Sequence, residues 1–245
     1  MDPDTIKKHV QHYYTQLFAR GRTVPTTVPI ASGRRLAMEL GYPQSLCDCI
    51  PNHLWDLFAA CGNPLPYLDG LDGQWVLNLG CGVGIDTLAL AVAHPDMHVV
   101  SLDVVWNVLH EGLSETVGRS QSSRNLHWVC GDAIELPFHT QCFDAAFLNG
   151  VFNLFADKRA LLGGLRRVLK PRSQLVIADL CSEAPLPDHF VEEADAWAWC
   201  MSGALTLIEL QNLLHQEGFD SITVQEKEGS EEFFRAVVTS RQSRV

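Results

Sequence analysis

From residue 74 onward, short apolar runs alternate with longer segments in which apolar residues recur every three or four positions. The short runs predict buried β-strands, and the periodic segments predict helices with one face in a core. The predicted strands are residues 75–79, 98–102, 126–130, 143–148 and 174–180, and the clearest predicted helices are residues 85–93 and 105–117. Strands that alternate with helices in this way form a parallel sheet covered by helices on both faces.

The last part of the chain predicts a helical insertion and then two further strands. Residues 185–218 begin with a proline-rich stretch, and Thr206 with Glu209 forms a capping-box pattern that opens a helix. The runs 221–227 and 233–240 predict an antiparallel pair at the sheet edge, and the tail that follows is expected to be loose. The whole pattern predicts an α/β fold with a Rossmann-like, seven-stranded, mostly parallel sheet and helices on both faces.

The first 70 residues predict helices instead of strands. Apolar residues between Ile6 and Phe18 fall on one face of a helix, whereas Gly21–Gly33 contains two prolines and no periodicity and predicts a loop. We therefore expect an N-terminal helical cap over residues 1–70 and a sheet-bearing domain over residues 71–245.

Composition and charge limit the classes of function. The chain has 245 residues, of which 47% are hydrophobic, and no window approaches the roughly 18 consecutive apolar residues of a membrane span. The polar start has no secretory apolar run, so we expect a cytoplasmic protein without membrane contact. The formal net charge of −11 and the absence of a basic patch favour a small-molecule substrate over nucleic acid. We expect a monomer.

The eight cysteines are expected to be reduced thiols, because a disulfide framework belongs to secreted chains. Cys47 and Cys49 resemble half of a metal site, but no second pair follows them, and the ten histidines have no metal-ligand spacing. We therefore expect no bound metal ion.

A glycine-rich turn, Gly80-Cys81-Gly82-Val83-Gly84, follows the first predicted strand and is the candidate cofactor site. Glycines let backbone approach a ligand closely, and the next helix offers free N–H groups. The spacing differs from the G-x-G-x-x-G dinucleotide fingerprint. Asp103 and Val104 end the second strand, where a carboxylate can accept hydrogen bonds from both ribose hydroxyls. Cys81 is expected to occupy the turn because of its small size.

Later features accompany this turn in order. Asp132 and Ala133 follow the third strand, where they can read an adenine edge, and the run from Arg166 to Pro171 precedes the fifth strand. This set resembles the class I S-adenosylmethionine (SAM) dependent methyltransferases over residues 75–180. The resemblance implies a SAM cofactor, with contacts from Gly80, Cys81, Gly82, Gly84, Asp103, Val104, Asp132, Ala133, Asn149 and Val151, the last two beside the methionine end. Asn78 departs from the pattern, because the family often has an acid there and the amide loses the charge that would face the methionine ammonium.

A closer resemblance, to the arsenite methyltransferase group, covers nearly the whole chain. The matching stretches are residues 9–14, 61–64, 84–86, 149–154 with 157–158, and 199–205. The resemblance implies that thiols hold trivalent arsenic beside the SAM methyl group. Cys61 and Cys200 match two of three family cysteines, and the middle one falls on Gly150.

Thiolate sulfur suits soft trivalent arsenic, whose lone pair can attack a methyl carbon without a general base. Positioning would therefore carry most of the catalysis. We expect a SAM-dependent methyltransferase that acts on a trivalent arsenical or another soft nucleophile, with Cys61 and Cys200 as its catalytic residues.

The missing third cysteine leaves alternatives open. A free thiol such as glutathione can complete the arsenic site, or Cys47, Cys49 or Cys181 can move into it, or Gly150 makes room for a different substrate. Three rival functions remain. They are N-, O- or S-methylation of a small organic metabolite, SAM binding without catalysis and, most distantly, a nicotinamide-dependent oxidoreductase.

Overall fold

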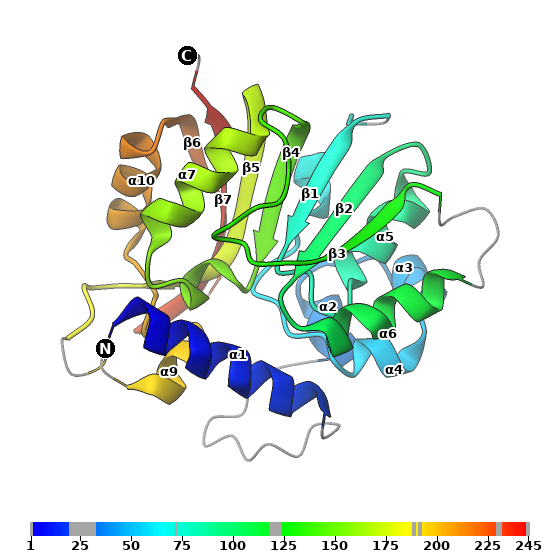
Figure 1. The fold of residues 1–245 in the computed structure, drawn as a ribbon, viewed down its shortest axis with the longest axis horizontal. Helices are drawn as coiled ribbons and strands as arrows, with labels where there is room; N and C mark the ends of the chain where they lie inside the picture. Colours follow the sequence, from blue (N-terminus) through cyan, green and yellow to red (C-terminus); the bar gives the residue numbers. More distant parts are fainter. Residues whose placement is uncertain are drawn as a thin grey trace.

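A seven-stranded sheet with the order β3-β2-β1-β4-β5-β7-β6 forms the centre of the molecule (Figure 1). The computed structural model describes residues 2–19, 33–71, 73–117, 124–187, 190, 193–228 and 232–243. The strands are β1 (Trp75–Leu79), β2 (His98–Asp103), β3 (Leu126–Cys130), β4 (Phe143–Asn149), β5 (Leu169–Ser182), β6 (Phe219–Glu228) and β7 (Phe233–Gln242). Strands β1 to β5 are parallel, and β7 lies antiparallel between β5 and β6. The predicted mostly parallel sheet with an antiparallel pair at its edge is confirmed.

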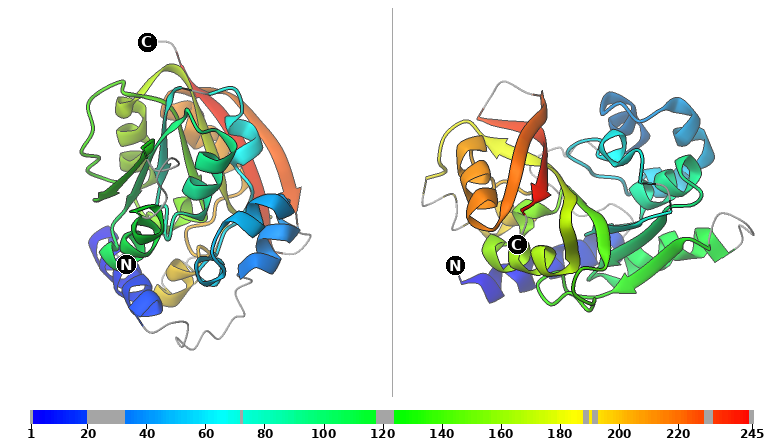
Figure 2. Two further views of the ribbon diagram at one scale, coloured as in Figure 1. Left: turned by 90° about the vertical axis from the view of Figure 1, so that its right-hand side faces the viewer. Right: turned by 90° about the horizontal axis from the view of Figure 1, so that it is seen from above.

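Helices cover both faces of this sheet, as Figure 2 shows for α2–α4 and α10 on opposite sides. Successive residues of a strand point to opposite faces, so Val76 packs with residues of α2 to α5, whereas Leu77 packs with residues of α7 and α10. The helices are α1 (Pro3–Ala19), α2 (Gly33–Glu39), α3 (Gln44–Cys49), α4 (Asn52–Trp55), α5 (Ile85–Ala93), α6 (Trp106–Val117), α7 (Lys158–Val168), α9 (Ala194–Ala198) and α10 (Leu207–Gln216), with short 3-10 turns η1 (Leu65–Leu68) and η2 (Phe152–Leu154).

Helix α1 crosses the carboxyl ends of the strands, with α9 beside it (Figure 1). Ile6 and Val10 of α1 pack against Trp197 of α9 in a small buried cluster. The predicted loop between α1 and α2 lies outside the described residues, except for Gly33, which begins α2. The division of the chain at residue 70 stays a prediction.

The sequence expectation of a loose tail is wrong for its first residues. Arg241 and Gln242 belong to β7, where Arg241 pairs with Gln174 of β5 and Gln242 pairs with Phe219 of β6. The Gln242 side chain is buried and donates to the Arg166 carbonyl at 3.1 Å. Polar residues are held here because β7 has a partner strand on each side.

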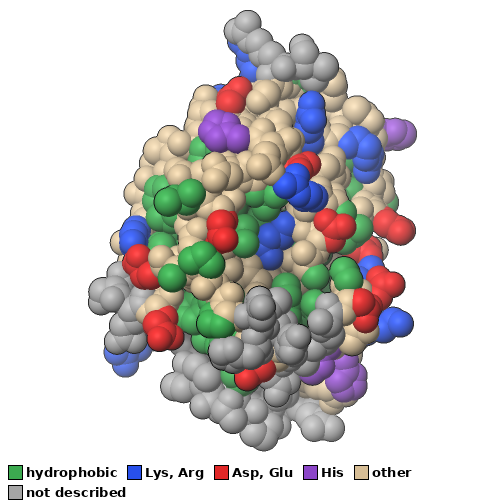
Figure 3. Space-filling view, turned by 90° about the vertical axis from the view of Figure 1, so that its left-hand side faces the viewer, with side chains coloured by type: hydrophobic (Ala, Val, Ile, Leu, Met, Phe, Trp, Pro, Cys, Tyr) green, Lys and Arg blue, Asp and Glu red, His purple; other side chains and the backbone are tan. Residues whose placement is uncertain are grey.

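On the face drawn in Figure 3, coloured Lys and Arg side chains are interspersed with Asp and Glu and do not gather into a basic patch. Within the described part of the chain, no helix has the length and apolar character that crossing a bilayer requires.

Candidate active site

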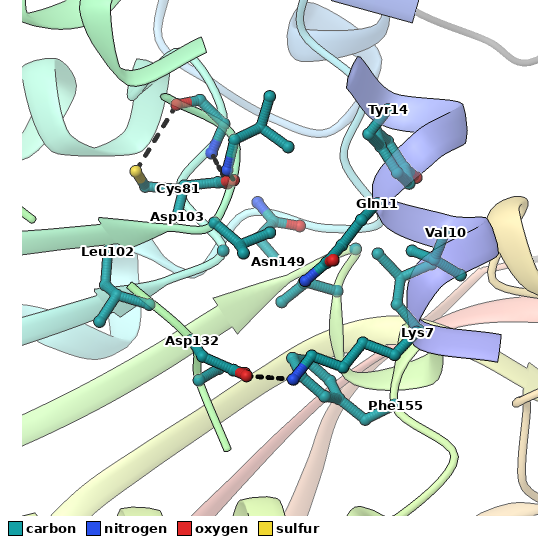
Figure 4. A pocket seen from close by; sticks show the side chains of 18 of the residues that line it. Lys7, Val10, Gln11, Tyr14, Cys81, Leu102, Asp103, Asp132, Asn149 and Phe155 are labelled. Carbon is teal, nitrogen blue, oxygen red and sulfur yellow. Dashed lines mark hydrogen bonds and ion pairs between the residues drawn. The ribbon is translucent and has the colours of Figure 1, made fainter. Parts of the chain in front are cut away.

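A cavity of about 340 Å³ lies between α1 and the carboxyl ends of β1 to β4 (Figure 4). The strand order reverses here, because β2 and β4 lie on opposite sides of β1, and such a switch point is the usual ligand site of an open α/β sheet. All of the predicted cofactor-binding residues except Gly84 line this cavity. They are Gly80, Cys81, Gly82, Asp103, Val104, Asp132, Ala133, Asn149 and Val151.

The glycine turn has the close packing that a backbone cradle requires. Gly80 has a φ of +73°, and a Cβ on it would lie 2.4 Å from Cγ2 of Val151. Its N–H donates to the Leu102 carbonyl at 2.8 Å, which ties the turn to β2. Gly84 is needed for a different reason, because a Cβ there would lie 2.2 Å from the Trp128 ring. Gly84 therefore lets α5 start against β3 and does not itself line the cavity.

Asp103 places its carboxylate beside the turn from the end of β2. Its Oδ2 accepts the Gly82 N–H and its Oδ1 accepts the Val105 N–H, both at 2.9 Å. Burial raises the pKa of this carboxyl. Each oxygen retains a lone pair, so the carboxylate can still accept hydrogen bonds from two hydroxyl groups.

Asp132 lies at the β3 end of the cavity and forms an ion pair with Lys7 of α1 (Figure 4). Its other oxygen accepts the Ile134 N–H at 3.0 Å. The pair joins α1 to the edge of the cavity where the sequence predicts an adenine contact. Sequence reasoning missed Lys7, because a lysine in a polar part of a helix does not by itself indicate a ligand site.

Asn149, at the end of β4, organises the next part of the site. Its Oδ1 accepts the N–H groups of Cys61 and Gly62 at 3.0 and 3.2 Å. Its Nδ2 donates to Oδ2 of Asp86 at 3.0 Å and lies 3.2 Å from the Tyr42 hydroxyl. The carboxamide therefore links the loop that carries Cys61 to the first turn of α5.

Asp86 is buried, lines the cavity, and accepts a hydrogen bond from the Tyr42 hydroxyl. Burial raises the pKa of Asp86 to about 6, although the hydrogen bonds from Tyr42 and Asn149 oppose the rise. Sequence reasoning did not predict Asp86 as a site residue, although residues 84–86 are one of the stretches that resemble the arsenite methyltransferase group.

Gly150 lies between the two predicted substrate thiols. A Cβ on Gly150 would lie 3.5 Å from Cys61 Sγ, and Cys200 Sγ donates to the Gly150 carbonyl at 3.3 Å. Gly150 lines the cavity, whereas Cys61 and Cys200 are not among its lining residues. The two thiols thus lie just behind the β4 end of the cavity, although they are 139 positions apart in the chain (200 − 61).

A buried acid and a buried base lie behind these thiols, and sequence reasoning missed both. Asp179, near the carboxyl end of β5, accepts the N–H groups of Asn153 and Leu180 at 3.1 and 2.8 Å, and burial raises its pKa to about 6. Lys158 donates to the Phe155 carbonyl at 2.9 Å. Burial lowers the pKa of Lys158 to about 8, while the charge of Asp179 opposes this change.

Both thiols are in the neutral form near pH 7. Burial raises the pKa of Cys61 and Cys200 well above the ordinary thiol value, and the negative charge of Asp179 raises both further. Asn153 connects Asp179 to Cys200. Its backbone N–H donates to Asp179, and its Nδ2 donates to the carbonyls of Leu180 and Cys200 at 2.7 and 3.0 Å. The pair is therefore a set of two protonated thiols held by an ordered polar network.

The other cysteines have different surroundings. Cys47 is fully buried in the core cluster that contains Trp55, Cys49 is exposed, and Cys181 is buried where Asp179 contributes to its raised pKa of about 12. None of the eight cysteines belongs to a disulfide bond. No three His, Cys, Asp or Glu side chains of the described residues are arranged to hold a metal ion.

Comparisons with known proteins give one consistent family. The family model described as a methyltransferase domain matches residues 71–228. The arsenite methyltransferase of Halobacterium salinarum is 31% identical over 179 residues, which are 73% of this chain and 45% of that protein. An O-methyltransferase of Penicillium expansum is 34% identical over 157 residues, which are 64% of this chain and 56% of that protein.

The chain therefore spans about half the length of these curated relatives. Among solved structures, an arsenic(III) S-adenosylmethionine methyltransferase from Chlamydomonas reinhardtii is similar with a TM-score of 0.71 and 25% sequence identity. That similarity covers 82% of this chain and 72% of the other.

Proposed function

This chain belongs to the SAM-dependent methyltransferases, and from that premise we propose that it methylates a small molecule held by Cys61 and Cys200. The leading acceptor is a trivalent arsenical, or another soft nucleophile that binds thiols. The observation that carries this proposal is the approach of both thiols to Gly150, at the β4 end of the cofactor cavity.

The residues of the cavity fit SAM. Gly80 lets the turn pack against Val151, which any Cβ would prevent, and Asp103 and Asp132 offer carboxylates at the ends of neighbouring strands. Asp103 would hold the ribose, Asp132 and Ala133 the adenine, and the methionine end would extend toward Asn149 and Val151. SAM supplies an electrophilic methyl group on a sulfonium centre. The strand order from β3 to β4 then directs that end of the ligand toward the thiols.

Protonated thiols suit a trivalent arsenical because arsenite carries hydroxyl ligands. When Cys61 binds, an As–S bond replaces an As–O bond, and the thiol proton leaves with the hydroxyl group as water. Cys200 can repeat the exchange, so no free thiolate is needed in the unbound site. The raised thiol pKa values and the softness of arsenic are therefore compatible.

Gly150 favours an external thiol as the third sulfur ligand. Its missing side chain leaves a position at ordinary contact distance, 3.5 Å, from Cys61 Sγ. Cys47 is held in the core with Trp55, and Cys181 is buried in the second core cluster, which argues against either one moving in. We infer that a small thiol such as glutathione completes the arsenic site.

A methyl-transfer assay with SAM, arsenite and a thiol reductant tests the proposal, with methylated arsenic measured by mass spectrometry. We expect Cys61→Ser and Cys200→Ser to lower turnover by at least about 10-fold, because each loses one soft ligand. Cys49→Ser, at an exposed position on α3, is the matched control and should retain full turnover. Full turnover of either site variant with arsenite, or no turnover by a wild-type protein that binds SAM, would contradict the arsenical acceptor.

The second candidate is N-, O- or S-methylation of an organic metabolite. Two observations favour it, the similarity to a fungal O-methyltransferase and the room that Gly150 leaves beside the methionine end. It requires turnover of an organic acceptor in the same assay and none of arsenite. SAM binding without turnover of any acceptor would instead support a non-catalytic protein. Location in the cytoplasm and a monomeric state stay predictions.

A further inference from the structure

A buried carboxylate without a cationic partner lies at the methionine side of the cavity. Asp86 belongs to the first turn of α5, is 7% exposed, and lines the cavity. Asn149, at the end of β4, donates to its Oδ2. Asn149 therefore links the carboxylate to the end of β4, where the backbone of Cys61 is also held.

Asn78 also lines the cavity, but its carboxamide carries no charge that would attract a cation. Its Nδ2 donates to the Thr87 hydroxyl at 3.0 Å, and that hydroxyl lies 2.6 Å from the Ser101 hydroxyl. The side chain is 2% exposed and is engaged in the protein interior. The residue at the position where this family often has an acid is thus neutral, and its amide nitrogen already has a partner in the protein.

The surroundings of Asp86 do not neutralise its charge. Its hydrogen-bond donors are the neutral groups of Tyr42 and Asn149, and its pKa is raised by burial. Among the described residues that line the cavity, the one lysine or arginine is Lys7, which pairs with Asp132. A buried carboxylate is costly unless it is paired, so a cation brought by a ligand would be stabilised at this point.

We propose that Asp86 binds the ammonium group of the SAM methionine moiety and so replaces the acid that is missing at position 78. The proposal rests on the SAM site and is independent of which acceptor is methylated. Tyr42 and Asn149 are positioning residues, because their hydrogen bonds hold the carboxylate in one orientation.

Binding of three adenosine thioethers tests the assignment by titration calorimetry at pH 8. S-adenosylhomocysteine carries the amino and carboxyl groups, the 3-carboxypropyl thioether of adenosine lacks only the amino group, and methylthioadenosine lacks both. The wild-type chain should prefer S-adenosylhomocysteine to the desamino ligand. Asp86→Asn should weaken S-adenosylhomocysteine by about 10- to 100-fold, the usual range for a hydrogen bond to a charged group, and leave methylthioadenosine within about 2-fold.

Tyr42→Phe gives a graded comparison, because it removes one of the hydrogen bonds that position Asp86 but keeps the carboxylate. This variant should reduce the preference for S-adenosylhomocysteine over the desamino ligand without abolishing it. The assignment is wrong if Asp86→Asn keeps that preference, or if it weakens all three ligands equally, as a merely structural role requires. A wild-type chain that binds none of the three would contradict the cofactor site itself, whereas failure of arsenite turnover alone leaves these ratios unaffected.

Discussion

Asn149 accepts the backbone N–H of Cys61 at 3.0 Å through the same carboxamide that donates to Asp86 at 3.0 Å. One side chain thus connects a predicted substrate thiol with the carboxylate that we propose for the methionine end of the cavity. The Gly62 N–H, at 3.2 Å, adds a second bond to the same oxygen. The loop before β1 and the start of α5 are therefore aligned by a residue of β4, which lies between them in space.

Asn149→Ala should impair both halves of the site. The change leaves the buried N–H groups of Cys61 and Gly62 without a partner, and each such loss costs about 1–3 kcal/mol. We expect the free energy of unfolding to fall by about 2–5 kcal/mol, the SAM KM to rise and kcat to fall together. Asn149→Asp keeps the accepting oxygen, so it should retain more stability in urea unfolding while it places a second carboxylate beside Asp86. Equal stability of the wild-type and Ala proteins would contradict this role of Asn149.

The sheet was predictable from the sequence because its strands are short, apolar and separated by periodic helices. The approach of Cys61 and Cys200 to Gly150 was implied only by the family resemblance, since no local pattern joins residues so far apart. Asp86 and Asp179 were not predicted as site residues. Their role depends on burial and on partners distant in the chain, as with Tyr42 and Asp86, which are separated by 44 positions.

The tail was mispredicted for a related reason. Gln242 is polar, and its local sequence does not predict a strand. Its order depends on Phe219 of β6 and on the Arg166 carbonyl, which reach it only in the folded chain. Gly84 illustrates the same limit. A side chain is excluded at Gly84 because a Cβ would collide with Trp128 of β3, and the sequence of the turn alone does not reveal this contact.

Gly150→Cys should install the third sulfur ligand. The nearest atom to its Cβ would be Cys61 Sγ at 3.5 Å, so the space exists, but the φ of +69° costs a non-glycine residue about 1–2 kcal/mol of stability. We expect arsenite turnover to become nearly independent of added glutathione. Gly150→Ala carries the same backbone cost without a thiol, and its turnover should still require glutathione. A Cys variant that keeps the full glutathione dependence of the wild type would exclude a third-ligand role for this position.

Asp179→Asn should make both substrate thiols more acidic. Burial remains the main cause of their raised pKa values, but removal of the Asp179 charge removes the next contribution. At pH 8 we expect the alkylation rates of Cys61 and Cys200, measured on separated peptides, to rise by roughly 3- to 10-fold, which corresponds to less than about one pKa unit. Cys142 is an internal reference, because burial raises its pKa without a contribution from Asp179. Unchanged rates at Cys61 and Cys200 would show that Asp179 does not act on them.

The titration of Asp86 should make the unbound protein less stable as the pH rises from about 4 to about 6. The folded-state pKa of about 6 lies above the unfolded value of about 3.9, so the folded state holds this proton more tightly. Its contribution to stability is therefore fully present below about pH 4 and is lost as the pH rises through 6. A shift of about two units corresponds to roughly 3 kcal/mol.

Urea unfolding of the wild type and of Asp86→Asn between pH 4 and 7.5 isolates this contribution, because other titrating groups cancel in the difference. The stability of the variant relative to the wild type should increase by up to about 3 kcal/mol across this range. Tyr42→Phe should move the transition to higher pH, since the Tyr42 hydrogen bond lowers the pKa of Asp86. Saturating S-adenosylhomocysteine should reduce the pH dependence of the wild type, because a bound ammonium stabilises the ionised carboxylate. If the difference between wild type and Asp86→Asn stayed constant with pH, the pKa of Asp86 would be the same in the folded and unfolded states, and the case for a buried carboxylate that awaits a cation would fail.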